Sequence, residues 1–424
     1  MEENRTEQLY KSRVRCANAL RLVKESIKLS DGQKQEILDY ADALFDSEHE
    51  PSTVTNKIER LRVLLEKKIT KDTFKQHNEA TLRQLKAAIR AHRFTVIRNI
   101  GTRKNKRLVK EEREASKSTK DRYLLSLRDI YRWLKRDDLA GQITLKRGRS
   151  HNRLPEEILD EDDIIKLINA SYTLRDKALI AVLWDSGMRI GELMSVRLKH
   201  MKFSGDEAII TAPEGKTGAR RVLLIPSVPY LANWCENHPK KPDSNAYLFI
   251  TIDPRQESRN AFLQPMSYTP VILLLKAIAK RAGVTKAVNP HAFRHAAATR
   301  DATHLKEPQM REKYGWTKDS NMPAVYVHLS GRDTDDAIRA QYGKETQSDK
   351  NNGFLLKSVQ CQSCQRVNPK ENKVCTLCGR PLNMEKMIST QVFKRELREL
   401  FENPKLLMAL KDKLESIDLH KSKD

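Results

Sequence analysis

The stretch that decides the fold of this chain covers residues 186–196 and reads SGMRIGELMSV. An apolar run at 175–185 precedes it and predicts a buried helix. Ser186 and Gly187 predict a turn, after which a second helix begins near Arg189. Because the start of a helix offers unpaired N–H groups to anions, and a guanidinium fork suits phosphate, Arg189 is a candidate phosphate ligand. Glu192 lies three residues further on and can orient that guanidinium.

Three later segments add side chains of related chemistry. The segment EAIITAPEGKTGARRVLLIP at 207–226, which ends in GKTGARRVLLIP, predicts a hairpin with Lys216 at its tip, and HAFRHAAAT at 291–299 predicts a helix. The segment YGWTKDSNMPAVYVHLS at 314–330 contains a further tryptophan and tyrosine. Cleaving a phosphodiester without a metal requires fixed cations, a nucleophile and an acid. The residues that together meet this need are Arg189, Lys216, His291, Arg294, Trp316 and Tyr326.

Each of these signals is weak alone. A lysine at a hairpin tip is usually solvated, and His295 reads most simply as a core histidine. Tyr314 and Tyr342 are rival nucleophiles in less suitable sequence contexts. The order and spacing of the whole set therefore carry the prediction of tyrosine-based DNA cleavage.

In order and approximate spacing, these four segments resemble the boxes of the tyrosine recombinase (phage integrase) family. The resemblance covers about 155–342 and extends more loosely over about 31–140, where the helices resemble the core-binding domain as seen in archaeal members. It implies that Arg189 and Arg294 bind the scissile phosphate, Lys216 is the general acid, His291 aids proton transfer and Tyr326 is the nucleophile. The family usually has histidine where this chain has Trp316, and an indole N–H still donates to phosphate. The interval from Trp316 to Tyr326 is also about one residue long.

The fold class that we expect is multidomain. An all-α core-binding domain at 1–140, with an extra helix within 1–30, precedes a basic linker at 141–156. A tyrosine recombinase catalytic domain at 157–345 is expected to be mixed α/β, mainly helical with a small antiparallel sheet. A zinc-ribbon module at 355–384 and a helical tail at 385–424 follow. That tail is either a packing helix or an oligomer contact.

Four of the six cysteines form the pattern C-x2-C-x10-C-x2-C, and they are Cys361, Cys364, Cys375 and Cys378. Two thiolate pairs at this spacing predict a closed, tetrahedral zinc site. Such a site has no open position, so the zinc is expected to be structural. No catalytic cofactor is expected, since GKTG lacks the full phosphate-binding loop pattern. The sequence leaves open whether the module contacts DNA or a neighbouring subunit.

The charge of the chain indicates its partner. It has 79 Lys and Arg against 56 Asp and Glu, a formal net charge of +23, which favours a polyanion, and double-stranded DNA before a membrane. We expect an intracellular, cytoplasmic protein associated with the nucleoid, because neither a signal peptide nor an apolar span is evident.

The function predicted from these features is site-specific DNA recombination, of the integrase or excision type, through a 3′-phosphotyrosyl intermediate. It needs neither metal nor ATP, and the family expectation is a homo-tetramer on DNA. Two alternatives remain at this point: a type IB-like topoisomerase, and a non-catalytic DNA-binding or architectural protein.

Overall fold

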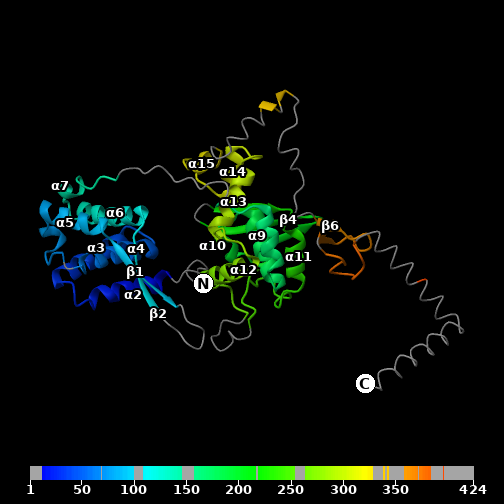
Figure 1. Ribbon diagram of the computed structural model, residues 1–424, viewed down its shortest axis with the longest axis horizontal. Coiled ribbons are helices and arrows are strands. Elements are labelled where there is room, and N and C mark those ends of the chain that lie inside the picture. The colour runs from blue at the N-terminus through cyan, green and yellow to red at the C-terminus, as the bar shows by residue number, and fades with distance from the viewer. Residues whose placement is uncertain are drawn as a thin grey trace, which may run out of the picture. The chain divides into compact units, whose positions relative to one another are not determined.

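The computed structural model describes residues 12–67, 69–99, 108–145, 157–215, 218–253, 263–327, 338–339, 341–342, 358–370, 372–382 and Arg395. The chain divides into two compact units, Met1–His151 and Asn152–Asp424, which are described separately (Figure 1). None of the described helices is long and apolar enough to cross a membrane.

The first unit is built on short helices around one apolar core. The helices are α2 (Ser12–Lys24), α3 (Asp31–Asp46), α4 (Pro51–Leu65), α5 (Glu79–Arg90), α6 (Lys117–Trp133) and α7 (Asp137–Ala140), with a 3-10 turn η1 (Phe74–Gln76). Side chains at helical spacing, such as Leu61, Leu64 and Leu65 on α4, are almost fully buried in this core. Helix α6 has one apolar face, which packs against this core and buries Leu127 and Tyr131.

An antiparallel ribbon in this unit contradicts the expectation that residues 1–140 are all helical. Strand β1 (Arg93–Asn99) pairs with β2 (Leu108–Glu114), from Arg93 opposite Glu114 to Asn99 opposite Leu108. The sequence of β1, RFTVIRN, concentrates aromatic and β-branched residues, which favour an extended backbone. The prediction was wrong here because the many charged residues around this run resemble a solvated helix face.

The second unit surrounds a buried helix, α9 (Leu174–Ser186), in which only Leu174 and Lys177 are not buried. Helices α8 (Glu161–Asn169), α11 (Val228–Glu236) and α13 (Pro290–Asp301) pack against it, as does strand β5 (Gly218–Leu224). Its C-terminus is capped by Gly187 in the left-handed conformation, with a φ of 57°. This cap turns the chain sharply, so that Arg189 directly precedes the next helix, α10 (Ile190–Ser195).

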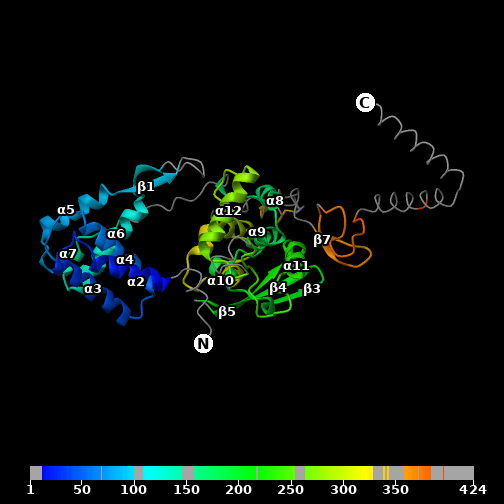
Figure 2. The same ribbon diagram turned by 90° about the horizontal axis from the view of Figure 1, so that it is seen from below.

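The sheet of the second unit has three antiparallel strands in the order β3–β4–β5, which Figure 2 shows as one layer beside the helices. Strand β3 (Met201–Ser204) follows the short turn η3 (Leu198–His200) and pairs with β4 (Glu207–Gly215). The β4–β5 hairpin ends with Gly215 opposite Gly218. The predicted hairpin is therefore present, while Lys216 at its tip lies outside the described residues.

The remaining helices of this unit complete the region that carries the predicted boxes. Among the described residues up to Val327 these are α12 (Tyr268–Ala282), α14 (Glu307–Tyr314) and α15 (Met322–Val327), and α13 contacts both α14 and α15. A small ribbon of β6 (Ser358–Gln360) and β7 (Val367–Pro369) follows, and β7 packs on α11. Apart from Arg395, the predicted tail at 385–424 lies outside the described residues.

Candidate active site

Both predicted phosphate ligands hold the same backbone carbonyl. Arg294 on α13 donates to the backbone carbonyl oxygen of Tyr314 at 2.6 Å and to that of Gly187 at 2.9 Å. Arg189 donates to the backbone carbonyl oxygen of Tyr314 at 3.5 Å and to that of Gly315 at 3.1 Å. Two guanidinium groups from segments about a hundred residues apart therefore converge at the C-terminus of α14. The negative end of that helix dipole favours them there.

Burial distinguishes the two arginines. Arg294 is 7% exposed, and burial, followed by the nearby charge of Arg189, lowers its pKa to about 10. A guanidinium with that pKa remains charged at pH 7. The Arg189 side chain is 44% exposed, so it is the more accessible of the two cations.

Glu192 aligns Arg189 and a further arginine that the sequence reading did not select. One carboxylate oxygen accepts from the Arg189 guanidinium at 3.0 Å, and the other accepts from the Arg220 guanidinium at 2.5 Å. Although burial alone raises the pKa of Glu192, the charge of Arg220 and hydrogen bonds from Arg189 hold the net pKa below its ordinary value. Arg220 also donates to the Lys313 carbonyl, which ties strand β5 to α14. Its position in GARR gave no local signal of this role.

Tyr326 lies at the end of a column of aromatic rings. Its ring is parallel to that of Trp316, with centroids 5.6 Å apart and an interplanar angle of 5°. Trp316 in turn stacks on Tyr314, at 4.9 Å and 19°. Tyr326 is only 2% exposed, so its hydroxyl is enclosed by protein in this conformation.

A histidine that was not among the predicted site residues, and for which a core position was an alternative, contacts the predicted nucleophile. His295 Nδ1 lies 2.6 Å from the Tyr326 hydroxyl oxygen, and His295 Nε2 lies 2.9 Å from His291 Nε2. His291 therefore reaches Tyr326 through His295. The spacing of the two histidines, i and i+4, places them on one helix face and was the available signal for this contact.

The rival nucleophile Tyr314 has a different environment. Its side chain is fully buried, and its hydroxyl donates to the Asp301 carboxylate at 2.7 Å. Burial, followed by the charge of Asp301, raises the Tyr314 pKa far above its ordinary value. Its phenolate is therefore strongly disfavoured. The other rival, Tyr342, is 74% exposed.

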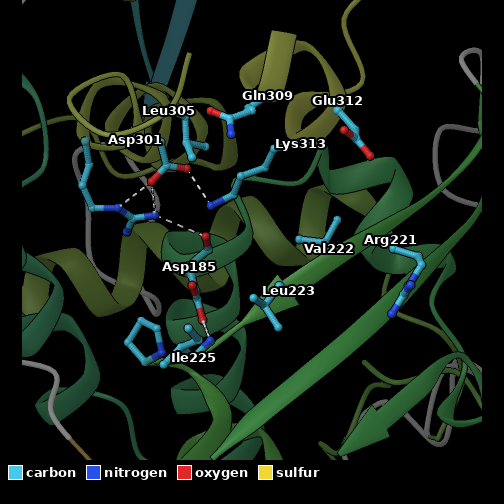
Figure 3. A pocket seen from close by; sticks show the side chains of 12 residues that line it. Asp185, Arg221, Val222, Leu223, Ile225, Asp301, Leu305, Gln309, Glu312 and Lys313 are labelled. Carbon is cyan, nitrogen blue, oxygen red and sulfur yellow. Dashed lines mark hydrogen bonds and ion pairs between the residues drawn. The ribbon is translucent and has the colours of Figure 1, made fainter. Parts of the chain in front are cut away.

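A cavity of about 430 Å³ lies beside this region (Figure 3). Strand β5 contributes Val222 and Leu223 to its wall, and α14 contributes Lys313. Asp301, at the end of α13, accepts from Lys313 at 2.6 Å, as a dashed line in Figure 3 shows. It also forms an ion pair with Arg300 at 2.9 Å. The described lining includes none of Arg189, His291, Arg294, Trp316 and Tyr326, while Lys216 lies outside the described residues. This cavity is therefore not the point where those five side chains meet.

The four clustered cysteines come together in the β6–β7 module. Their sulfur atoms all lie within 4.8 Å of one another, and the pairs Cys361–Cys378 and Cys364–Cys375 are each 3.6 Å apart. The two C-x2-C turns repeat one backbone pattern. The amide of Cys361 donates to the Arg366 carbonyl and that of Cys375 to the Arg380 carbonyl, both at 2.7 Å. The backbone is left-handed just after each turn, at Gln365 (φ 59°) and Gly379 (φ 70°).

This module contacts the rest of its unit through charge as well as packing. The Arg366 guanidinium forms an ion pair with Glu236 at the end of α11. The neighbouring Cys235 is an isolated cysteine whose pKa is raised to about 12, mainly by burial.

Comparison with known proteins agrees with the arrangement of the boxes. Residues 157–332 match the model of the phage integrase family. The tyrosine recombinase XerC of Alcanivorax borkumensis is 30% identical over 233 residues, which cover 50% of this chain and 70% of that protein. A tyrosine recombinase of Thermosipho africanus is 27% identical over 289 residues, which cover 62% of this chain and 94% of that protein.

A solved structure shows the same fold. The recombinase XerH, bound to its difH substrate after cleavage, aligns with a TM-score of 0.50 and 17% identity, over 81% of this chain and 98% of that one. At this identity the likeness concerns the fold alone. Together with the sequence relatives and the convergence of arginines, histidines and tyrosine at one site, it identifies the chain as a member of the phage integrase family of tyrosine recombinases, and hence as a DNA strand transferase of the tyrosine type.

Proposed function

We propose that Tyr326 is the nucleophile of this site-specific recombinase, and that Arg189 and Arg294 hold the scissile phosphate. The convergence of both guanidinium groups with the His295–Tyr326 contact on one side of α13 is the observation that carries this proposal. Charge-assisted, bidentate bonds to phosphate are stronger than bonds to a neutral carbonyl. A bound phosphate is therefore expected to replace the Tyr314 carbonyl that both arginines hold in this conformation.

The chemistry requires one bond to form and one to break. The Tyr326 hydroxyl oxygen attacks phosphorus, the bond from phosphorus to the 5′-oxygen breaks, and the tyrosine stays linked to the 3′-phosphate. Lys216 gives the 5′-oxygen its proton, His291 aids proton transfer, and the Trp316 indole N–H donates to the phosphate. Rejoining follows the same steps in reverse, and because the phosphotyrosyl link conserves the bond energy, no ATP is consumed.

A trapping experiment tests the nucleophile. Wild-type protein is incubated with nicked suicide duplexes that carry a randomised core, covalent adducts are isolated, and the attached DNA is sequenced to define the site. On the selected duplex, Tyr326→Phe should bind but form no adduct. Tyr342→Phe removes a hydroxyl from an exposed tyrosine and should react like wild type. Adducts that persist in Tyr326→Phe would show that another residue attacks.

The same experiment separates the alternatives. A type IB-like topoisomerase would relax supercoiled plasmid without a preferred sequence, whereas a recombinase enriches one site. An architectural protein would bind DNA without forming adducts at any site. The integrase or excision direction is then read from reactions between two selected duplexes. The archaeal-type assignment and the predicted domain bounds stay predictions.

We also propose that Cys361, Cys364, Cys375 and Cys378 hold one structural zinc ion. Four thiolates at a zinc–sulfur distance of about 2.3 Å in a tetrahedron would lie about 3.8 Å apart, close to the two 3.6 Å pairs. The ion would fix the zinc-ribbon module and supply no catalytic chemistry, since all four positions are filled by protein. Cys361→Ser should lower the zinc content measured by mass spectrometry, and Cys235→Ser should not.

The assembly is proposed to be a homo-tetramer on double-stranded DNA, in the cytoplasm with the nucleoid. Recombination joins two duplexes, each of which requires two cleaving subunits, and the net charge of +23 favours DNA as the partner. The tail at 385–424 is the proposed contact between subunits. Deleting it should weaken synapsis of two duplexes more than binding to one site, in gel-shift assays. Equal loss of both would remove the tail from this role.

A further inference from the structure

The histidine pair on α13 forms a continuous path from the Tyr326 hydroxyl. His295 Nδ1 is 2.6 Å from the hydroxyl oxygen, and the ring centroids are 5.5 Å apart. The opposite ring nitrogen of His295, Nε2, is 2.9 Å from His291 Nε2, with the two rings nearly perpendicular at 81°. Both distances are those of hydrogen bonds.

Proton counting restricts how this path is occupied. The contact between the two Nε2 atoms holds one hydrogen, because one nitrogen must donate and the other accept. In one arrangement Tyr326 donates to His295, and His295 donates to His291. Moving one proton along each link gives the second arrangement, in which Tyr326 is a phenolate and His291 carries two N–H groups and the positive charge. No proton is gained or lost overall.

Resting on the function proposed above, we propose that His295 is a catalytic residue that accepts the Tyr326 proton during attack and passes its own Nε2 proton to His291. The relay runs backward when the DNA is rejoined, and the tyrosine recovers its hydroxyl.

A relay of this kind meets a specific chemical need. A phenol with an ordinary pKa of about 10 is ionised in only about one molecule in 1,000 at pH 7. A base in hydrogen-bond contact removes that limitation and typically contributes about 10²- to 10⁴-fold in rate. The charge ends on His291, which is exposed, whereas the Tyr326 side chain is enclosed. The positive charge therefore forms on the ring that is open to solvent, where hydration stabilises it.

The test uses His295→Asn, which keeps a polar atom near the Nδ1 position but cannot accept a proton at neutral pH. Single-turnover adduct formation is measured on the suicide duplex selected with wild type. It is measured again on the same duplex with sulfur replacing the bridging 5′-oxygen, because a sulfur leaving group needs no proton. We expect His295→Asn to be about 100-fold or more slower on both duplexes. Lys216→Ala removes the proposed acid, so its rate of adduct formation should recover on the sulfur-substituted duplex.

His304→Asn is the matched control, because His304 is an exposed histidine just beyond the same helix. The relay would be overturned if His295→Asn formed adducts at the wild-type rate on either duplex, including recovery of that rate on the sulfur-substituted duplex alone. Tyr326 would remain the proposed nucleophile. Adducts in Tyr326→Phe would instead overturn the proposed function itself.

A measurement on the unsubstituted chain is independent of any folding defect. Nitrogen-15 NMR of histidine side chains in the full protein reports which ring nitrogen carries hydrogen. Near pH 8, His295 should carry it on Nε2, with Nδ1 accepting from Tyr326, and Tyr326→Phe should shift the Nδ1 signal. A hydrogen fixed on Nδ1 of His295 would leave no acceptor for the tyrosine proton and would refute the proposal.

Discussion

Gly187→Ala is expected to damage both the stability and the site of this recombinase. Gly187 has a φ of 57°, and a Cβ there would lie 2.6 Å from Cε1 of Tyr314 and 3.0 Å from Cβ of Ala297. The left-handed backbone costs an alanine about 1–2 kcal/mol. Forcing the fully buried Tyr314 ring aside adds about 1–3 kcal/mol, as for other overpacked cores. The sum is about 2–5 kcal/mol.

Gly283→Ala separates the two contributions. Gly283 also ends a helix in the left-handed conformation, with a φ of 68°, but a Cβ there would meet nothing within 4 Å. It should therefore lose only the backbone part, about 1–2 kcal/mol. Because the chain has two compact units, two-state unfolding is not assured, and hydrogen exchange of α9 and α13 amides is the suitable measurement.

The functional part of this prediction follows from the contacts of the same glycine. The Gly187 carbonyl accepts from Arg294. The Tyr314 ring, which the added Cβ would displace, stacks on Trp316, and Trp316 stacks on Tyr326. Since a misplacement of about 1 Å can cost about 100-fold in rate, adduct formation by Gly187→Ala should fall by at least about 10-fold. Gly283→Ala should keep wild-type rates. Equal destabilisation by the two substitutions, or an unchanged rate in Gly187→Ala, would refute the coupling of this turn to the site.

Three further predictions concern the surroundings of the site and the cysteine module. Tyr314→Phe should lower the free energy of unfolding by about 1.5–3 kcal/mol in hydrogen exchange, because the Asp301 carboxylate loses a buried donor, and it should still form adducts. Although burial raises the Asp301 pKa, the charge of Arg300 brings the net pKa below its ordinary value. The ionised carboxylate therefore stabilises the fold above about pH 4 and loses that effect as pH falls further. Between pH 7 and pH 3, the midpoint temperature of thermal unfolding should fall less in Asp301→Asn than in wild type. Gln365→Gly should tighten zinc binding in competition with a chelator, because it relieves a left-handed residue by about 1 kcal/mol, and Gly379→Ala should weaken it by a similar amount.

Local sequence was sufficient for much of the site. Arg189 and Glu192 are three residues apart, and the prediction that the carboxylate orients the guanidinium is confirmed by their 3.0 Å contact. The left-handed turn at Gly187 was also predictable, since glycine after an apolar helix commonly ends it. These features depend on neighbours in sequence, which a pattern of residues can express.

The features that sequence reasoning missed depend on contacts between distant segments. Arg220 meets Glu192 only because β5 packs beside α14 while its partner strand β4 packs beside α10. Nothing in GARR distinguishes Arg220 from Arg221. His295 meets Tyr326 across 31 positions of sequence, through the packing of α13 against α15. In the ribbon β1–β2, pairing between strands outweighed a charged composition that suggested helix.

The contacts of the site also explain why Tyr326, the proposed nucleophile, is enclosed by protein. The Tyr314 carbonyl, at the end of α14, accepts from both arginines, and the Tyr314 ring supports the stacked Trp316 and Tyr326. Tyr314 thus holds both guanidinium groups through its backbone carbonyl and supports Tyr326, the proposed nucleophile, through its ring. Under the proposed function, a phosphate is a stronger acceptor than a neutral carbonyl and competes for the same guanidinium donors that hold the C-terminus of α14. The two arginines and Tyr326 are coupled through Tyr314, so we expect a phosphate that engages both arginines to loosen the aromatic stack that encloses Tyr326.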